Sequence, residues 1–163
     1  MAGRRAEIRR RFNVTQQFEE LEESCLPSYC HPNPLAAYAA WWRLFAAAKL
    51  APQTGPLLDF GAASGEFAYL QTGDYDYVEG NEVLAKALAA DLPSAQRQTL
   101  NALPSAHYST IVALDSLEHN DDSRQIIDLL VNSLRQDGSF ILSGPTENFL
   151  YRIGRRLAGF NGH

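Results

Sequence analysis

The sequence predicts an α/β fold built on a parallel β-sheet, and three observations support this class. The chain has 163 residues, a length typical of one domain. Hydrophobic residues make up 45% and charged residues 20%, which is typical of a globular protein and excludes a disordered or fibrous chain. After Gly55, short and nearly continuous apolar runs alternate with helical stretches, as expected for strands that helices cover on both faces.

A first helix is expected at residues 35–50, upstream of the alternating region. This stretch is rich in alanine and aromatic residues, and Pro52 ends it. It contains Arg43 and Lys49 and is shorter than the ~20 residues that a membrane span needs. We therefore interpret it as a buried or interfacial helix.

The alternating region supplies the elements of the sheet. Asn81 is a favourable helix N-cap, and Gly138 stands where a helix C-terminus favours glycine. Strands are expected at 57–60, 75–78, 95–99, 110–114 and 140–142, and helices at 64–71, 81–90, from 123 to about 134, and from about 147. The predicted fold is a Rossmann-like domain with about five parallel strands and helices on both faces.

Residues 1–34 are predicted to be a basic helix followed by a connector, with the folded domain in residues 35–163. Five arginines and one glutamate occupy the first eleven residues, whereas the whole chain carries a net charge of −5. A nucleic-acid-binding protein usually carries its positive charge on the folded domain. The basic segment is thus interpreted as a solvated helix or tail, with a phosphate-binding arm as the alternative.

Cysteine usage and the start of the chain indicate a cytoplasmic protein. The two cysteines, Cys25 and Cys30, are too few for a disulfide scaffold, and no secretory signal pattern opens the sequence. Cys25, Cys30 and His31 suggest metal ligands, but no second ligand pair follows at finger-like spacing, so two ordinary thiols are the expected outcome.

The candidate ligand site is expected at the carboxyl ends of the strands, where ligands bind in open α/β sheets. The first strand leads into Asp59-Phe-Gly61-Ala-Ala63-Ser-Gly65, where small residues let the backbone approach a ligand. Glu79 ends the second strand, twenty residues after Asp59, where a carboxylate can accept both ribose hydroxyls. These residues predict a nucleoside-binding turn.

Two common nucleotide motifs are excluded. A dinucleotide fingerprint beginning at Gly61 would place Glu66 at its third glycine, where a carboxylate would repel a pyrophosphate. A phosphate-binding G-x-x-x-x-G-K-[ST] loop is also missing from the sequence. Asp59, directly before the turn, favours a positively charged ligand over a phosphorylated one.

Several segments together resemble the class I S-adenosylmethionine-dependent methyltransferases. Asp59-x-Gly61-x-Ala63-x-Gly65 is similar to motif I of this family, with alanine in place of the middle glycine. Val78-Glu79 and the following helix resemble its second-strand end, and the segment from Tyr108 to Leu117-Glu118-His119 resembles its fourth strand. Arg135-Gln-Asp-Gly138 is similar to the turn into its fifth strand. The likeness covers about residues 35–142.

The resemblance implies S-adenosylmethionine as cofactor and assigns a role to each matching position. The implied cofactor-binding residues are Asp59, Gly61, Ala63 and Gly65 in motif I, Glu79 at the ribose, Asn101 at the adenine amino group, and Asp115 after the fourth strand. Three of these roles have an alternative: Asp59 could only hold the turn, Asn101 could form a turn, and Glu79 could be a solvated strand end.

His119 is the candidate catalytic base, since its ordinary pKa of ~6.5 suits proton transfer near neutral pH. A structural or helix-capping histidine is the alternative. Asp115, Glu118, Asp121 and Asp122 lie close to it in the sequence, but such acidic loops are usually solvated, so we expect no metal site.

The predicted function is methyl transfer from S-adenosylmethionine to a small-molecule or lipid-linked acceptor. Two alternatives stay open. One is a nucleic-acid methyltransferase, which only the arginine-rich segment supports, so nucleic acid is not the expected partner. The other is a cofactor-binding module without catalysis. Members of this family usually add two strands after the fifth helix, so we expect a C-terminally incomplete domain that is itself an inactive truncation. The basic final helix is expected to pack on the sheet, with peripheral membrane contact as the alternative.

Overall fold

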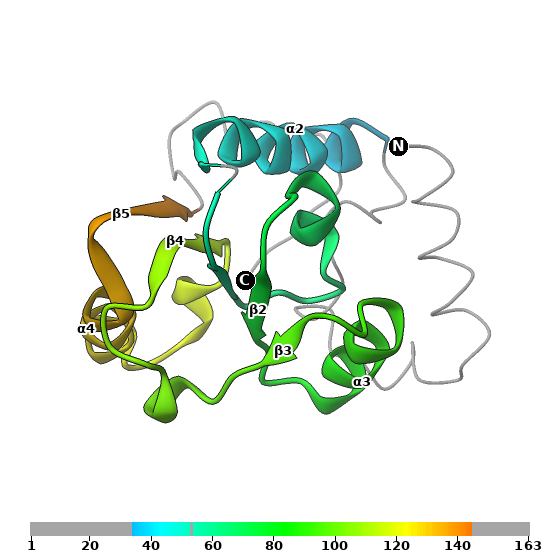
Figure 1. Ribbon diagram of the computed structural model, residues 1–163. Helices are drawn as coiled ribbons and strands as arrows, with labels where there is room; N and C mark the ends of the chain where they lie inside the picture. Colours follow the sequence, from blue (N-terminus) through cyan, green and yellow to red (C-terminus); the bar gives the residue numbers. More distant parts are fainter. Residues whose placement is uncertain (1–33, 53, 145–163) are drawn as a thin grey trace. The chain divides into compact units, whose positions relative to one another are not determined.

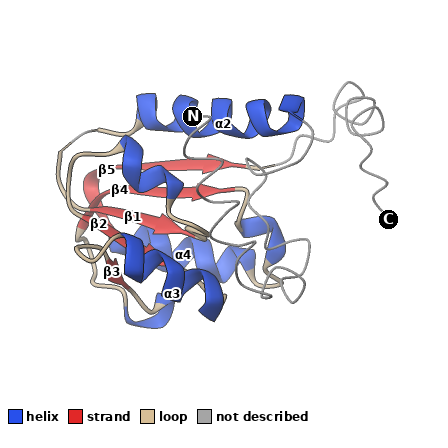
Figure 2. Ribbon diagram, turned by 90° about the vertical axis from the view of Figure 1, so that its right-hand side faces the viewer, coloured by secondary structure: helices blue, strands red, loops and turns tan. Residues whose placement is uncertain are grey.

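The computed structural model describes residues 34–52 and 54–144, and its sheet lies within one compact unit, Arg43–Gly144. The sheet has five strands in the order β3-β2-β1-β4-β5, and all neighbouring strands pair in parallel (Figures 1 and 2). The strands are β1 (Leu57–Phe60), β2 (Tyr75–Val78), β3 (Gln96–Arg97), β4 (Tyr108–Leu114) and β5 (Leu134–Ser143). The predicted α/β fold with about five parallel strands is confirmed.

β1 is the central strand, and its sequence explains its position. All four of its residues are buried, and it pairs with β2 on one side and β4 on the other. A strand without a solvent-facing side chain needs cover on both faces, as the apolar run predicted. The chain crosses from β3 at one edge back to β4, so the strand order reverses between β1 and β4. Ligands of open α/β sheets bind at such a switch point.

Helices lie on both faces of this sheet. α3 (Glu82–Asp91) and α4 (Ser123–Ser133) are on opposite faces (Figures 1 and 2). α3 begins at the predicted cap, because the Asn81 side chain accepts hydrogen bonds from the amides of Val83 and Leu84 at 3.0 and 3.2 Å. This bond pair fixes the start of α3 directly after the end of β2.

The main core cluster joins the sheet to α4. Its buried members are Leu58, Phe60, Tyr108, Ile111, Ala113, Leu117, Ile126 and Leu130. The α4 residues Ile126 and Leu130 have the helical spacing on which that helix was predicted. Burial of these side chains supplies much of the free energy that keeps the strand ends in place.

Three elements differ from the expectation. The helix predicted at 64–71 is a short 3-10 helix, η4 (Glu66–Leu70), and the strand predicted at 95–99 is only two residues long. β5 is longer than predicted because it contains Gly138, which was expected at a helix end. The pairing of β5 with β4 shifts register beside Gly138, and a Cβ on that residue would lie 2.7 Å from Leu134 Cγ. Gly138 therefore lies within an irregular strand and not at the end of a helix.

α2 (Pro34–Leu50) confirms the first predicted helix. Its residues 43–50 belong to the unit of the sheet and include the buried Leu44 and Ala47. In the described part of the other unit, residues 34–42, the rings of Tyr38 and Trp42 have centroids 6.2 Å apart. No helix among the described residues has the length and apolar character needed to cross a membrane. The predicted basic helix, the cysteine connector and the final helix lie outside the described residues.

Candidate functional site

The turn after β1 forms the centre of the candidate site. Three of its residues have positive φ angles: 75° at Gly61, 49° at Ala63 and 74° at Gly65. The left-handed region costs a residue with a Cβ roughly 1–2 kcal/mol, so Ala63 occupies a conformation that glycine would adopt more easily. The turn thus keeps the conformation of a glycine-rich loop although its middle residue is alanine.

Gly61 brings the end of β1 against the end of β4. A Cβ at this position would lie 2.4 Å from the Cβ of Ser116, a distance that no real pair of carbons tolerates. The Ser116 hydroxyl donates to the Phe60 carbonyl at 2.9 Å, which holds the two strand ends together. Only glycine fits between them.

Glu79 and the turn meet, as the sequence predicted. Glu79 Oε2 accepts a hydrogen bond from the Ala63 amide at 2.7 Å, and Oε1 accepts one from the Asn81 amide at 2.7 Å. An ionised carboxylate offers about four acceptor positions, so these bonds leave each oxygen with capacity for a further donor. The two backbone bonds also fix the orientation of the carboxylate.

Asp59 is a buried residue of β1, two positions before Gly61. Its carboxylate accepts a hydrogen bond from the Tyr75 hydroxyl at 2.5 Å. Burial raises its pKa to about 7, and the nearby negative charge of Glu79 adds to the rise, while the Tyr75 bond opposes it. The Asp59 carboxylate is thus buried and bonded to β2, and it is not presented to solvent at the turn.

The burial of Asp59 predicts a pH-dependent stability. Because its folded pKa exceeds the unfolded value of 3.8, the folded chain binds more protons than the unfolded chain between about pH 4 and 7. Stability from this residue should therefore fall as the pH rises through that window. Each pKa unit corresponds to ~1.4 kcal/mol, so the burial of the charge costs at most about 4 kcal/mol above pH 7. Asp59→Asn should remove this cost, and its stabilising effect at pH 8 should exceed that at pH 5 by at most about 3 kcal/mol.

Thermal unfolding midpoints of the wild type and Asp59→Asn at both pH values measure this effect. Asparagine keeps an oxygen that accepts the Tyr75 bond, so the comparison isolates the charge. An equal difference between the two proteins at pH 5 and pH 8 would contradict the assignment.

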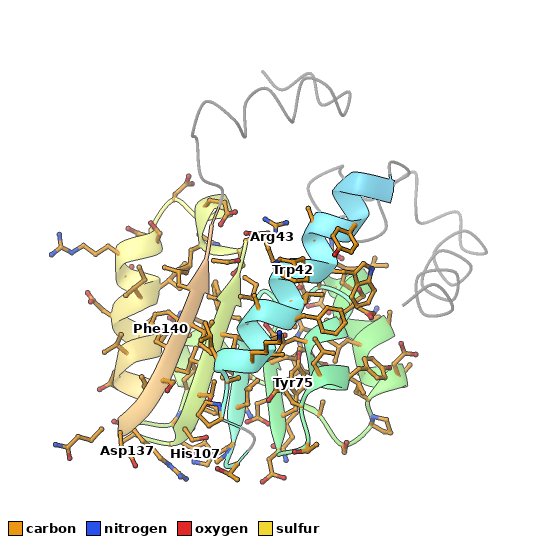
Figure 3. The ribbon with its side chains drawn as sticks, turned by 90° about the horizontal axis from the view of Figure 1, so that it is seen from above. Trp42, Arg43, Tyr75, His107, Asp137 and Phe140 are labelled. Carbon is orange, nitrogen blue, oxygen red and sulfur yellow. The ribbon has the colours of Figure 1, made fainter. Side chains whose placement is uncertain are left out.

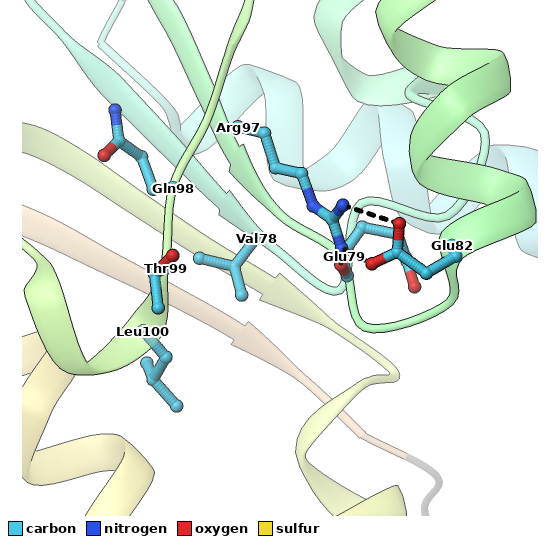
Figure 4. A pocket seen from close by; sticks show the side chains of 7 residues that line it. All are labelled: Val78, Glu79, Glu82, Arg97, Gln98, Thr99 and Leu100. Atoms are coloured by element: carbon cyan, nitrogen blue, oxygen red, sulfur yellow. Dashed lines mark hydrogen bonds and ion pairs between the residues drawn. The ribbon is translucent and has the colours of Figure 1, made fainter.

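A hollow of about 420 Å³ opens beside Glu79, at the ends of β2 and β3 (Figure 4). It is lined by Val78, Glu79, Glu82, Arg97, Gln98, Thr99 and Leu100. The Arg97 guanidinium donates to both carboxylate oxygens of Glu82, at 2.6 and 3.0 Å, and holds the pKa of that carboxyl below its usual value. The lining therefore combines the apolar side chains of Val78 and Leu100 with polar and charged ones.

Sequence reasoning missed Arg97 and Thr99 and selected Asn101 instead. Asn101 is an exposed residue of the 3-10 helix η5 (Leu100–Ala102), and it is not among the described residues that line the hollow. Its role at the adenine stays a prediction without a contact to support it. Thr99 is the last residue of the predicted third strand, and the end of a strand is where a ligand-facing residue is expected, so the sequence could have identified it.

Asp115 lies at the other side of the turn, after β4. It has a φ of 50°, forms an ion pair with Arg43 at 2.5 Å, and accepts a hydrogen bond from the Ser143 hydroxyl at 3.0 Å. Figure 3 shows Arg43 at the carboxyl ends of β4 and β5, with His107 and Asp137 at the opposite end of the sheet. Asp115 is thus placed at the predicted edge, but its charge is already balanced by Arg43.

His119 closes the 3-10 helix η6 (Leu117–His119), directly after Asp115 and Ser116. Its side chain lies outside the described residues, so its role as a base stays a prediction. Across the described part of the chain, no three His, Cys, Asp or Glu residues form a group that could hold a metal ion.

The chain belongs to a methyltransferase family. The model of this family, described as a methyltransferase domain, matches residues 35–160, which is most of the chain. No curated protein matches the sequence.

Solved structures share this fold at low sequence identity. The YcgJ protein from Bacillus subtilis is 18% identical with a TM-score of 0.60, and the match covers 71% of this chain and 58% of that one. An S-adenosylmethionine-dependent methyltransferase from Mesorhizobium loti is 19% identical with a TM-score of 0.54, over 65% and 53% of the two chains. The [4+2]-cyclase SpnF is 15% identical with a TM-score of 0.60, over 66% and 45%.

The chain spans about half the length of these structures. At such identities the likeness establishes the fold alone. The name of SpnF, a cyclase, also illustrates that this fold does not fix the reaction.

Proposed function

We propose that this protein binds S-adenosylmethionine and transfers its methyl group to a small-molecule or lipid-linked acceptor. The observation that carries the proposal is the Glu79 carboxylate, held 2.7 Å from the Ala63 amide of the motif I turn and at the rim of the hollow. Family membership supports the reaction class, and the geometry of Glu79 and the turn supports binding of the nucleoside part of the cofactor.

The residues present fit this cofactor. Glu79 keeps acceptor capacity for two ribose hydroxyls, and Val78 and Leu100 supply apolar lining to the hollow, which a base can contact. Gly61 leaves the turn free of a side chain where the backbone must approach the ligand. When bound, the cofactor would supply an activated methyl group on a sulfonium, so the protein needs no nucleophile of its own.

The chain's own contribution is to bind and orient the two reactants and to exclude water. The proposed arrangement places the nucleoside over β2 and β3, with the acceptor toward the ends of β4 and β5, where Asp115 and His119 follow β4. A hydroxyl or amine acceptor must lose a proton, and His119 is the proposed base. Positioned bases contribute ~10²–10⁴-fold to rates.

Net charge supports the choice of acceptor class. The chain carries a net charge of −5, which disfavours the phosphates of a nucleic acid. The arginine-rich segment on which nucleic-acid binding would depend lies outside the described residues. We therefore prefer a small-molecule or lipid-linked acceptor.

Calorimetric titration of the full chain tests the proposal. S-adenosylmethionine and S-adenosylhomocysteine should bind and raise the unfolding midpoint, whereas NAD should do neither. Incubation with methyl-labelled S-adenosylmethionine and separate aqueous and lipid extracts then identifies the acceptor class. Failure of both adenosyl compounds to bind would refute the proposal, and tight binding without label transfer to either extract would favour a binding module without catalysis.

A further inference from the structure

Arg97 makes a set of contacts that its position in a short edge strand does not require. Its Nη1 and Nη2 donate to the two carboxylate oxygens of Glu82 at 3.0 and 2.6 Å. Nη2 also donates to the backbone carbonyl of Glu79 at 2.8 Å. Figure 4 shows the guanidinium between these two residues, at the rim of the hollow. One side chain of β3 thus holds both ends of the turn that joins β2 to α3.

That turn carries the carboxylate on which ribose binding depends. The side chain of Glu79 is held by the amides of Ala63 and Asn81, and the side chain of Asn81 caps α3. These contacts fix the carboxylate relative to the β1 turn and the helix. Arg97 bonds the backbone of Glu79 instead of its side chain: it donates to the Glu79 carbonyl and so links this residue to β3. Both the backbone and the side chain of Glu79 are therefore constrained.

We propose that Arg97 is a positioning residue for cofactor binding: with Glu82 as its counter-charge, it holds the Glu79 backbone so that the carboxylate faces the ribose hydroxyls. This inference rests on the proposed function. A planar guanidinium can span two acceptors in fixed directions, which the single ammonium of lysine cannot do. The contribution of the pair to stability should be small, because the Arg97 and Glu82 side chains are 38% and 65% exposed.

The test is a double-mutant cycle on the dissociation constant of S-adenosylhomocysteine, measured by calorimetry on the full chain. Arg97→Ala should weaken binding about 5- to 10-fold, and Arg97→Lys should give an intermediate loss. In the Glu79→Ala background, Arg97→Ala should cause less than a twofold further loss, because the group it positions is gone. Arg124→Ala is the matched control, since Arg124 is an exposed arginine on α4, across the sheet from α3.

The unfolding midpoint of each variant separates positioning from folding. A loss of affinity in Arg97→Ala with an unchanged midpoint and a clear coupling to Glu79 would support the inference. Equal losses in the wild-type and Glu79→Ala backgrounds, or no loss at all, would overturn it while leaving the proposed function intact. A wild type that does not bind S-adenosylhomocysteine would refute the proposed function, and this inference with it.

Discussion

Replacement of Glu79 by alanine should weaken S-adenosylhomocysteine binding about 100-fold, since two hydrogen bonds to a charged carboxylate contribute ~1.5 kcal/mol or more each. The carboxylate lies 2.7 Å from the Ala63 amide and at the rim of the hollow, so its removal eliminates the proposed ribose acceptor. Calorimetric titration measures the change. Glu79→Gln, which keeps one carbonyl acceptor, should lose only about tenfold.

The control for this prediction is Asp128→Ala, because Asp128 is an exposed carboxylate on α4 and does not line the hollow. Glu79→Ala also removes the partner of two backbone amides, so the unfolding midpoint must accompany every titration. If Glu79→Ala binds within twofold of the wild type, the ribose assignment is wrong. A similar loss in Asp128→Ala would indicate a general charge effect instead.

The sheet and the meeting of its strand ends could be predicted from the sequence because they depend on local patterns. Apolar runs bounded by glycine and proline placed β1, β2 and β4, and Asn81 placed the start of α3. The contact between the turn and Glu79 follows from topology, since β1 and β2 are parallel neighbours that end at the same edge. No side-chain detail was needed for that step.

The contacts around the site that could not be predicted depend on tertiary placement. β3 is polar and two residues long, so no periodicity marked Arg97 or its reach to Glu79 and Glu82. The Arg43–Asp115 ion pair joins a helix to a distant strand end, and neither residue carries a local signal for the other. The register shift between β4 and β5 likewise has no signal in the sequence, where Gly138 favoured a helix end instead.

Gly61→Ala should be the most destabilising single change in the turn. The left-handed φ of 75° costs alanine roughly 1–2 kcal/mol, and overlap with the Ser116 Cβ adds about 1–3 kcal/mol. The expected loss of unfolding free energy is about 3 kcal/mol, measured by urea denaturation. Gly80→Ala is the matched control, because a Cβ there meets nothing within 4 Å and the change should stay within ~1 kcal/mol.

The two parts of that cost can be separated with Ser116→Gly. Combining it with Gly61→Ala removes the carbon that the new methyl group overlaps, so the double variant should recover the packing cost but not the backbone cost. Ser116→Gly alone loses the hydroxyl bond to the Phe60 carbonyl and sets the reference for the comparison. If Gly61→Ala is as stable as Gly80→Ala, the close approach of β1 and β4 does not constrain the turn. Full additivity of the two substitutions would show that the Gly61 cost is conformational alone.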